Sequence, residues 1–429
     1  MFLFFKMKVN YILFLFFLFF SLPIFALNVE ETIKSTVENN HKIRIGLEKI
    51  NESKELIKKA TGELLPELSS TITGTYESKS TLQDDTFSDT YKLTVSQNLY
   101  DAGYNELEIE RSKILYSNEI LNFQILVENL ILDAILGYLT VINYEKLLDT
   151  TNKNFEAVSK VLDETKTKFN LGVSTLYDLQ IAESSFALAQ ANLFSANQNL
   201  LIGKRSFKRI VGLNAINLED VIDINNDIDL TVIEDNTLKN NLSLKIIKNN
   251  IENIKILLLK EKKTKYPNLD LSANVEYSDT DRINSGTETT KGNIKFTLSI
   301  PIFQQGIDDS NIRKYHSQIL QSELNLQDTI EDLMLNLANT YKDFKINESL
   351  MKANIASIKA SETSLLSLKQ EFSIGTKTIS ELISEEEKLL NTKVNYFNAK
   401  KDYLIAYFKI QSFEGTLLHN FKEYIPDIN

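Results

Sequence analysis

Hydrophobic and polar residues alternate with a period of two in four stretches of the chain, which form two pairs. The clearest stretches, 269–277 and 294–302, follow Pro267, and weaker versions, 68–76 and 91–95, follow Pro66. Successive side chains of a strand point to opposite faces, so this period indicates strands with one apolar and one polar face. The pattern predicts two β-hairpins, at about 66–100 and about 267–303.

Strands of about ten residues with an apolar and a polar face are typical of a membrane barrel with a wet interior. A soluble amphipathic hairpin that packs on a core gives the same alternation, so the pattern alone leaves both interpretations open. The segments 79–89 and 278–291 between the strands are polar and are expected to form exposed loops.

Each pair of strands is followed by about 65 residues that read as one helix, from Tyr104 to about Lys168 and from Ile307 to about Glu371. An unbroken helix of that size is about 95 Å long. A seven-residue apolar row runs through both helices: Ile109, Tyr116, Phe123 and Leu130, then Ile312, Ile319, Leu326 and Leu333. Such spacing favours helices that pack side by side, as in a coiled coil. A soluble coiled coil explains the heptads, but not the strands.

The chain turns after these helices at Gly172 and Gly375, each followed by Ser or Thr residues suited to cap a new helix. These two glycines lie 203 residues apart, as do Gly103 and Gly306. We infer an internal tandem duplication of a whole structural unit. The predicted domains are a signal peptide (1–26), a first repeat (27–212), a connector (213–236), a second repeat (237–417) and a C-terminal tail (418–429).

The first 26 residues read as an export signal. Lys6 and Lys8 precede the apolar run 11–20, and a breaker, Pro23, is followed by the small residue Ala26. An uncleaved membrane anchor is the alternative, but Pro23 interrupts the run before the roughly 20 residues that a span needs. No later stretch is expected to cross a bilayer as a helix, so an integral membrane protein would have to use its strands.

Four strands with open edges cannot stand alone in lipid, because every backbone N–H and C=O there needs a partner. Two copies of the chain would give 8 strands and a barrel filled by side chains, whereas three would give 12 strands and room for a pore. The expected fold is therefore mainly α with a β-barrel part: a trimeric 12-stranded transmembrane barrel, continued by a helical barrel.

Composition removes several other classes of protein. The net charge of −11 argues against nucleic-acid binding, and the absence of Cys excludes disulfides and thiolate metal sites. The three His residues are far apart in the sequence, and no catalytic motif is present, so neither an enzyme, a metal site nor a cofactor is expected.

The chain resembles the TolC-like outer-membrane efflux proteins. The resemblance is carried by Gly375–Leu382, by 398–403 with 415–417, and in the first repeat by Phe169–Gly172 with Tyr177–Gln180. It implies a homotrimer in outer-membrane lipid whose helical tunnel crosses the periplasm. It also implies a passive duct for efflux or type I secretion that works with a periplasmic adaptor protein and an inner-membrane transporter.

The resemblance also implies roles for particular residues. The turns Leu171-Gly172-Val173 and Ile374-Gly375-Thr376 would dock the adaptor. Glu381 falls on the first acidic position of a ring at the periplasmic entrance; the second position is Ser384, with Glu385 beside it. Asp178 and Lys377 fall on two partners of a polar link that keeps the entrance shut, and a third partner, usually Tyr, is Phe372 here.

Two other classes remain as alternatives. A periplasmic coiled-coil adaptor or scaffold would be soluble after signal removal, so extraction of membranes with and without detergent separates it from a channel. A specific porin would need many more strands per chain than four.

Overall fold

The computed structural model describes residues 27–79, 84–220, 224, 228–282 and 286–426, so the predicted signal peptide lies outside the described residues. The chain divides into two compact units. The sheet unit contains Lys42–Leu126 and Glu234–Asn336, and the hairpin unit contains the chain up to His41 with Val127–Ile233 and Leu337–Pro426. Two helices of 67 residues each, α4 (Tyr104–Asn170) and α8 (Ile307–Ser373), run through both units.

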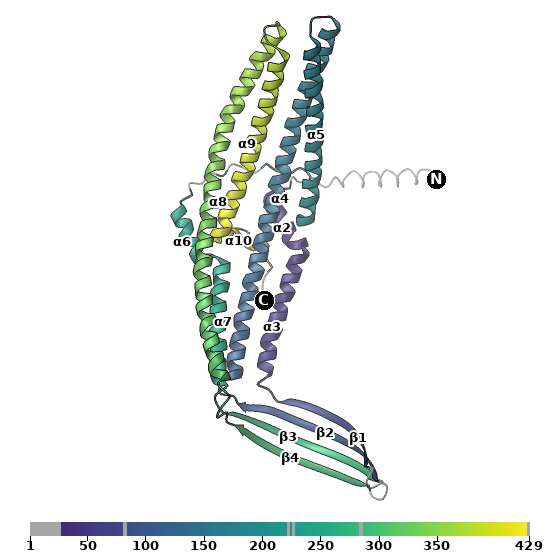
Figure 1. Ribbon diagram of the computed structural model, residues 1–429, viewed down its shortest axis with the longest axis vertical. Helices are drawn as coiled ribbons and strands as arrows, with labels where there is room; N and C mark the ends of the chain where they lie inside the picture. The colour runs from purple at the N-terminus through teal and green to yellow at the C-terminus, as the bar shows by residue number, and fades with distance from the viewer. Residues whose placement is uncertain (1–26, 80–83, 221–223, 225–227, 283–285, 427–429) are drawn as a thin grey trace, which may run out of the picture. The chain divides into compact units, whose positions relative to one another are not determined.

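The sheet unit holds four antiparallel strands in the order β1-β2-β3-β4 (Figure 1). The strands are β1 (Glu67–Lys79), β2 (Asp84–Tyr100), β3 (Asn268–Arg282) and β4 (Thr287–Ser299). They extend into the segments 79–89 and 278–291, which the sequence assigned to loops. The reason is that the backbone ladder continues, for example at Ser88↔Thr280, into segments where most residues are polar and the regular alternation has ended.

Three helical segments of the sheet unit pack closely on one another. A Cβ added to Gly46 of α3 (His41–Gly62) would lie 2.6 Å from the ring of Phe123 on α4, so glycine permits this approach. Asn118 on α4 exchanges amide hydrogen bonds of 2.8–2.9 Å with Asn249 and Asn250 of α7 (Leu242–Lys263). Polar pairs therefore fix the contact between α4 and α7.

The hairpin unit is built from two helical hairpins, α4–α5 and α8–α9 (Figure 1). Its further helices are α5 (Leu176–Val211), α9 (Ile379–Glu414), α2 (Val29–Asn39), α10 (Thr416–Asn420) and the short 3₁₀ helix η1 (Lys422–Tyr424). The ring of Phe344 on α8 stacks on Tyr403 of α9, with the ring centres 4.7 Å apart. Aromatic and aliphatic contacts of this kind form the core of the unit.

The stretches 29–65 and 237–265, each expected to be one helix, are both broken. Asn40 ends α2, and its side-chain amide donates to the carbonyl of Ile210 at 3.2 Å. Asn241 lies between α6 (Leu230–Asn240) and α7, and its side chain accepts a hydrogen bond from the backbone N–H of Leu244. Because an Asn side chain bonds readily to the backbone at helix ends, each break occurs where a tertiary or capping bond replaces a helical one.

One described helix, α4, contains a stretch long and apolar enough to cross a membrane, contrary to the sequence expectation. Half of that stretch is buried inside the chain. Val127, Ile131, Ala134 and Ile135 of α4 are each at most 2 % exposed. Packing within the hairpin unit accounts for the apolar character of this helix, because such positions are core positions in the folded chain.

The two repeats share local backbone geometry as well as order. The residue pairs Ala102-Gly103 and Gln305-Gly306, which come just before α4 and α8, all have positive φ. The glycines of both hairpin turns, Gly172 and Gly375, have φ of +76° and +80°. The predicted internal duplication and the mainly helical fold with four strands per chain are therefore confirmed. The exact domain limits stay a prediction.

Candidate functional site

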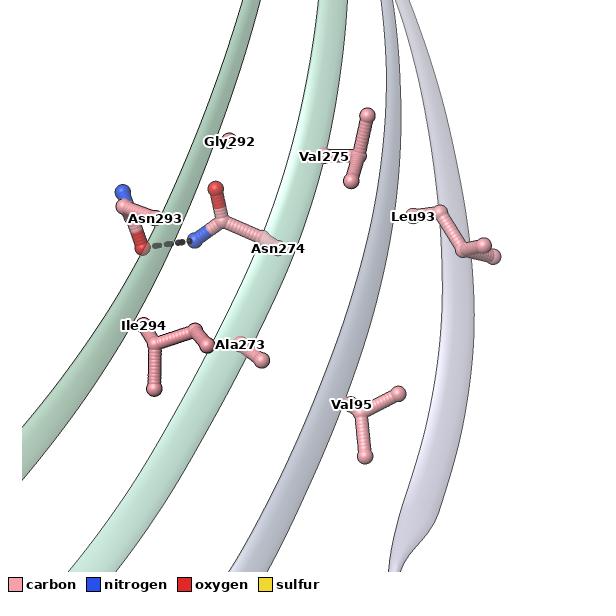
Figure 2. Close-up of a pocket in the computed structure, with 8 residues that line it drawn as sticks. All are labelled: Leu93, Val95, Ala273, Asn274, Val275, Gly292, Asn293 and Ile294. Atoms are coloured by element: carbon pink, nitrogen blue, oxygen red, sulfur yellow. Dashed lines mark hydrogen bonds between the residues drawn. The ribbon is translucent and has the colours of Figure 1, made fainter.

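The sheet has one apolar face, and its cross-strand register sets the extent of that face. The register aligns Leu68, Val95, Ala273 and Ile294 in one row across the four strands. The neighbouring rows toward the hairpin tips contain Leu93 with Val275, then Ile72 with Tyr91 and Tyr277. Figure 2 shows Leu93, Val95, Ala273, Val275 and Ile294 gathered over the neighbouring strands.

The chain itself does not cover this face. Ile72, Phe296 and Ile294 are 72 %, 65 % and 73 % exposed. An exposed apolar surface of this extent is typical of a site that contacts another protein or a membrane. The next row toward the tips, Asp89, Asp279 and Glu288, is acidic and bounds the aliphatic part of this face. Exposed aromatic rings of Tyr76 and Phe87 lie beyond it.

The opposite face is polar along the whole sheet. The hydroxyl of Ser88 on β2 lies 3.5 Å from that of Ser278 and 3.2 Å from that of Thr280, both on β3. The side-chain amide of Asn274 donates to Asn293 at 3.0 Å (Figure 2). Side chains with hydroxyl and amide groups are suited to a face that contacts water.

The two outer edges of the sheet have no neighbouring strand among the described residues, where β1 pairs with β2 alone and β4 with β3 alone. Each edge therefore presents a row of backbone N–H and C=O groups that need partners. In an apolar medium only closure of the sheet with further copies satisfies them.

The hairpin turns expose apolar side chains on a rigid backbone. In the first turn the N–H of Val173 donates to Lys168 and that of Gly172 to Phe169, both at 2.9 Å. Equivalent bonds of 3.0–3.1 Å close the second turn. The left-handed glycine supplies the backbone angles that this type of helix end requires. Leu171, Val173 and Ile374 are each at least 73 % exposed, so the predicted docking turns are accessible in the chain.

Asp178 and Glu381 occupy equivalent positions, each at the third residue of a helix with a capping box. The hydroxyl of Thr175 donates to Asp178 at 2.7 Å, and that of Thr378 donates to Glu381 at 2.9 Å. In return, the backbone N–H of each acid donates to the threonine hydroxyl. The two predicted entrance carboxylates therefore start the second helix of each hairpin.

These hydrogen bonds favour the charged form of both carboxylates. The side-chain bond from Thr175 is the main cause that lowers the pKa of Asp178. The backbone N–H of Thr378, with help from Lys377, lowers the pKa of Glu381 to about 2. Both groups are thus ionised at neutral pH, so Glu381 carries the negative charge that the predicted acidic ring needs and Asp178 the charge that the predicted link needs.

Within one chain Asp178 and Lys377 have different partners. The Nζ of Lys377 lies 2.9 Å from Oε1 of Glu381, one helical turn along the chain, whereas Asp178 accepts from Ser174 and Thr175. Glu385 pairs with Lys388 at 3.3 Å. The predicted link between helices at the entrance therefore stays a prediction.

Sequence reasoning missed two contacts near the tips of the helical hairpins, one between the two hairpins and one within α8–α9. The Nζ of Lys168 on α4 lies 4.1 Å from the ring centre of Phe372 on α8. Lys369 on α8 pairs with the buried Glu386 on α9 at 2.7 Å. From the sequence, Phe372 stands out only because it lacks the hydroxyl of the Tyr that is usual at this position. A cation–π contact has no characteristic residue spacing, so the sequence does not reveal it.

An apolar cluster surrounds these contacts and draws on all four helices. Its buried members are Val161, Leu162, Ala182, Leu365, Ile379, Leu382 and Ile383. Phe372 packs against this cluster. The ends of the two hairpins are therefore held together within one chain by burial of apolar side chains.

An amphipathic four-stranded sheet with open edges, joined to two long helical hairpins, defines a β-barrel membrane protein with a helical extension. The chain belongs to the outer membrane efflux protein family, whose family model matches residues 32–213 and 235–416. The predicted family and outer-membrane localisation, with a large helical part in the periplasm, are thereby confirmed.

Three comparisons illustrate the likeness. The chain is 24 % identical over 306 residues to the outer membrane protein TolC of Escherichia coli (strain K12), covering 68 % of this chain and 62 % of that protein. It is 22 % identical over 417 residues to TolC of Vibrio cholerae, covering 92 % of each. The fold matches the crystal structure of the CmeC outer membrane channel of Campylobacter jejuni, with a TM-score of 0.79, 15 % identity and coverage of 92 % and 89 %.

Proposed function

We propose that three copies of this chain close their sheets into one 12-stranded barrel in the outer membrane and form a passive exit duct. The helices continue the duct across the periplasm, where a periplasmic adaptor links it to an inner-membrane pump for efflux or type I secretion. The protein has no catalytic role of its own and acts as a conduit.

The observation that carries the proposal is the sheet with an apolar face, a polar face and two open edges. Two copies would make 8 strands, which leave an interior just wide enough for side chains, whereas 12 strands leave room for an aqueous channel. The apolar face fits contact with lipid, and the polar face fits contact with water.

The absence of Cys from the chain allows a direct test of closure. Within one chain β1 and β4 are separated by β2 and β3, a distance of about 14 Å at the usual strand spacing. A disulfide needs Cα atoms within about 7 Å, so a bond between β1 and β4 must join two chains. Thr73→Cys on β1 is combined in turn with Thr287→Cys, Thr289→Cys, Lys291→Cys or Asn293→Cys on β4.

We expect one or two of these combinations to give covalent trimers on a non-reducing gel of oxidised membranes. Thr73→Cys alone, which lacks the β4 partner, is the control and should give no trimer. A ladder that stops at dimers, or a monomeric chain extracted without detergent, would refute the trimeric barrel.

The entrance roles of Asp178, Lys377, Glu381 and Glu385 are part of the same proposal. They are supported by the equivalent positions of the two acids and by their ionised state. Glu381→Gln separates the two roles of this residue, since glutamine preserves a capping box and removes the charge. We expect Glu381→Gln to weaken cation preference in planar bilayers without loss of stability.

Lys377→Ala tests the entrance link between Asp178 and Lys377. Lys377 is the better residue to replace, because Asp178 also belongs to a capping box and Lys377 does not. We expect a higher conductance than in the unmodified protein. Equal conductance in both proteins would remove the link from the proposal. The docking turns are tested by Gly375→Ala, which should reduce export by the assembled system while barrel conductance stays constant.

A further inference from the structure

The polar face of the sheet contains one charged row at mid-height. The register places Thr71, Lys92, Glu276 and Lys291 side by side, one from each strand. The Nζ of Lys92 lies 4.0 Å from a carboxylate oxygen of Glu276, and Lys291 is exposed on the last strand. The row therefore contains two positive charges and one negative charge per chain.

The rows on either side of this one are neutral. One consists of Ser69, Thr94, Asn274 and Asn293, and the other of Thr73, Thr90, Ser278 and Thr289. The next charged row toward the helices contains Glu67 and Lys295, whose charges cancel. Rows of one face are about 6.7 Å apart, so on the polar face the excess charge at Lys92, Glu276 and Lys291 lies at least about 13 Å from the next charged row, which exceeds a Debye length of about 10 Å. The acidic row that contains Asp89 and Asp279 belongs to the opposite face.

We propose that Thr71, Lys92, Glu276 and Lys291 form a positively charged belt inside the barrel, which favours anions and the anionic groups of transported molecules. This inference rests on the proposed function, because the belt encircles a lumen only if three sheets close. In the closed barrel the row contains six lysines and three glutamates, with each glutamate between two lysines, and leaves three positive charges. The belt is separate from the acidic residues at the helical hairpin ends.

Lys291 contributes most to the excess charge, because the Lys92 charge is offset by its contact with Glu276. A unit charge about 8 Å from a passing ion changes the local concentration of that ion about two-fold in water. Removing one lysine should therefore shift the anion-to-cation permeability ratio by about two-fold or more, since three copies change together. The shift should disappear in 1 M salt, where the Debye length is about 3 Å.

The experiment measures reversal potentials of the full-length protein in planar bilayers under a KCl gradient at low salt. We expect Lys291→Gln to shift selectivity toward cations and Glu276→Gln to shift it toward anions. Lys291→Arg, which preserves the charge, should leave selectivity unchanged. Lys239→Gln on α6 removes the same charge outside the sheet and serves as the matched control.

The possible failures are distinguishable. Trimers that insert and conduct, but whose selectivity is the same in Lys291→Gln, Glu276→Gln and the unmodified protein, would overturn the belt and leave the duct intact. A selectivity shift that persists unchanged in 1 M KCl would also overturn it, because the cause could not be a screened charge. An unmodified protein that never conducts would instead overturn the proposed function.

Discussion

Replacing Tyr138 by Phe tests the contact that attaches the connector between the repeats to the hairpin unit. Tyr138 lies on α4 and is 1 % exposed. Its hydroxyl donates to the backbone carbonyl of Glu219 at 2.6 Å and lies 3.0 Å from the backbone carbonyl oxygen of Leu27. Leu27 and Leu218 form a β-bridge at the same point, so one side chain joins α4, the start of the described chain and the connector.

The Tyr138→Phe substitution preserves the ring and its packing and removes only the hydroxyl. Removing this hydroxyl takes a hydrogen-bond partner from two part-buried carbonyls, so we expect the free energy of unfolding to fall by about 1–2 kcal/mol. The duplication supplies a matched control: Tyr341 is the equivalent residue, is only partly buried, and contacts one carbonyl, that of Ile228, at 3.2 Å. Tyr341→Phe should cost about 0.5–1.5 kcal/mol.

The assay is denaturant unfolding of the detergent-solubilised protein, followed by circular dichroism at 222 nm. A lower midpoint with an unchanged slope reports a loss of stability without a change in the surface exposed. Equal midpoints for the two variants would refute the reasoning, because the geometry assigns the larger effect to Tyr138.

Tyr138 should also make the stability of the protein depend on pH in the alkaline range. Burial, with the charge of Glu219 in addition, raises the pKa of Tyr138 to about 12. Above pH 10 the unfolded chain loses this proton first, so stability falls as the pH rises from 10 to 12. Tyr138→Phe should remove part of that fall, whereas Tyr341→Phe should leave it in place.

Two further predictions concern single side chains of the hairpin unit. Burial raises the pKa of Glu128 to about 7. The protonated carboxyl therefore contributes stability below pH 4.5, and this contribution is lost as the pH rises through 7. Glu128→Gln should stabilise the protein at pH 8 by about 2–3 kcal/mol, and melting curves between pH 5 and 8 should show a weaker dependence of stability on pH. Gly172→Ala and Gly375→Ala should each lower the free energy of unfolding by about 1 kcal/mol in thermal unfolding, because both glycines have left-handed φ. Gly62→Ala is the control, because a Cβ there would meet nothing within 4 Å. An equal loss of stability in Gly62→Ala would contradict the argument.

The elements with the longest periodic patterns were predicted well from the sequence. The two long helices and the four strands each repeat one period over many residues, and the duplication gives each pattern a second copy. The prediction of continuous helices was wrong where single polar residues interrupt the pattern. Asn40 and Asn241 break helices that were expected to be continuous, and the breaks depend on side-chain bonds that spacing does not reveal.

The candidate site was predicted less completely, because its residues act through contacts rather than through a motif. Asp178 and Glu381 were singled out by resemblance, yet the capping boxes give both a local structural role as well. The register of the strands was not predicted, and with it the row that contains Lys92, Glu276 and Lys291 remained hidden. Period two identifies the faces of a strand, but only pairing decides which residues of different strands lie side by side.

The two repeats have the same backbone geometry at the hairpin turns but differ in charge, and one of these differences gives only the second repeat a cationic partner for its capping-box carboxylate. Ser174 in the first repeat occupies the position that Lys377 occupies in the second. Each hydrogen-bonds to the carboxylate of its own capping box. If Lys377 leaves Glu381 for Asp178 of a neighbouring chain, the bonds from Thr378 still hold Glu381 in place. Only an exposed ion pair is exchanged, and exposed pairs contribute little to stability. Under the proposed entrance link, the second repeat therefore exchanges this ion pair while the helix ends of both repeats stay intact.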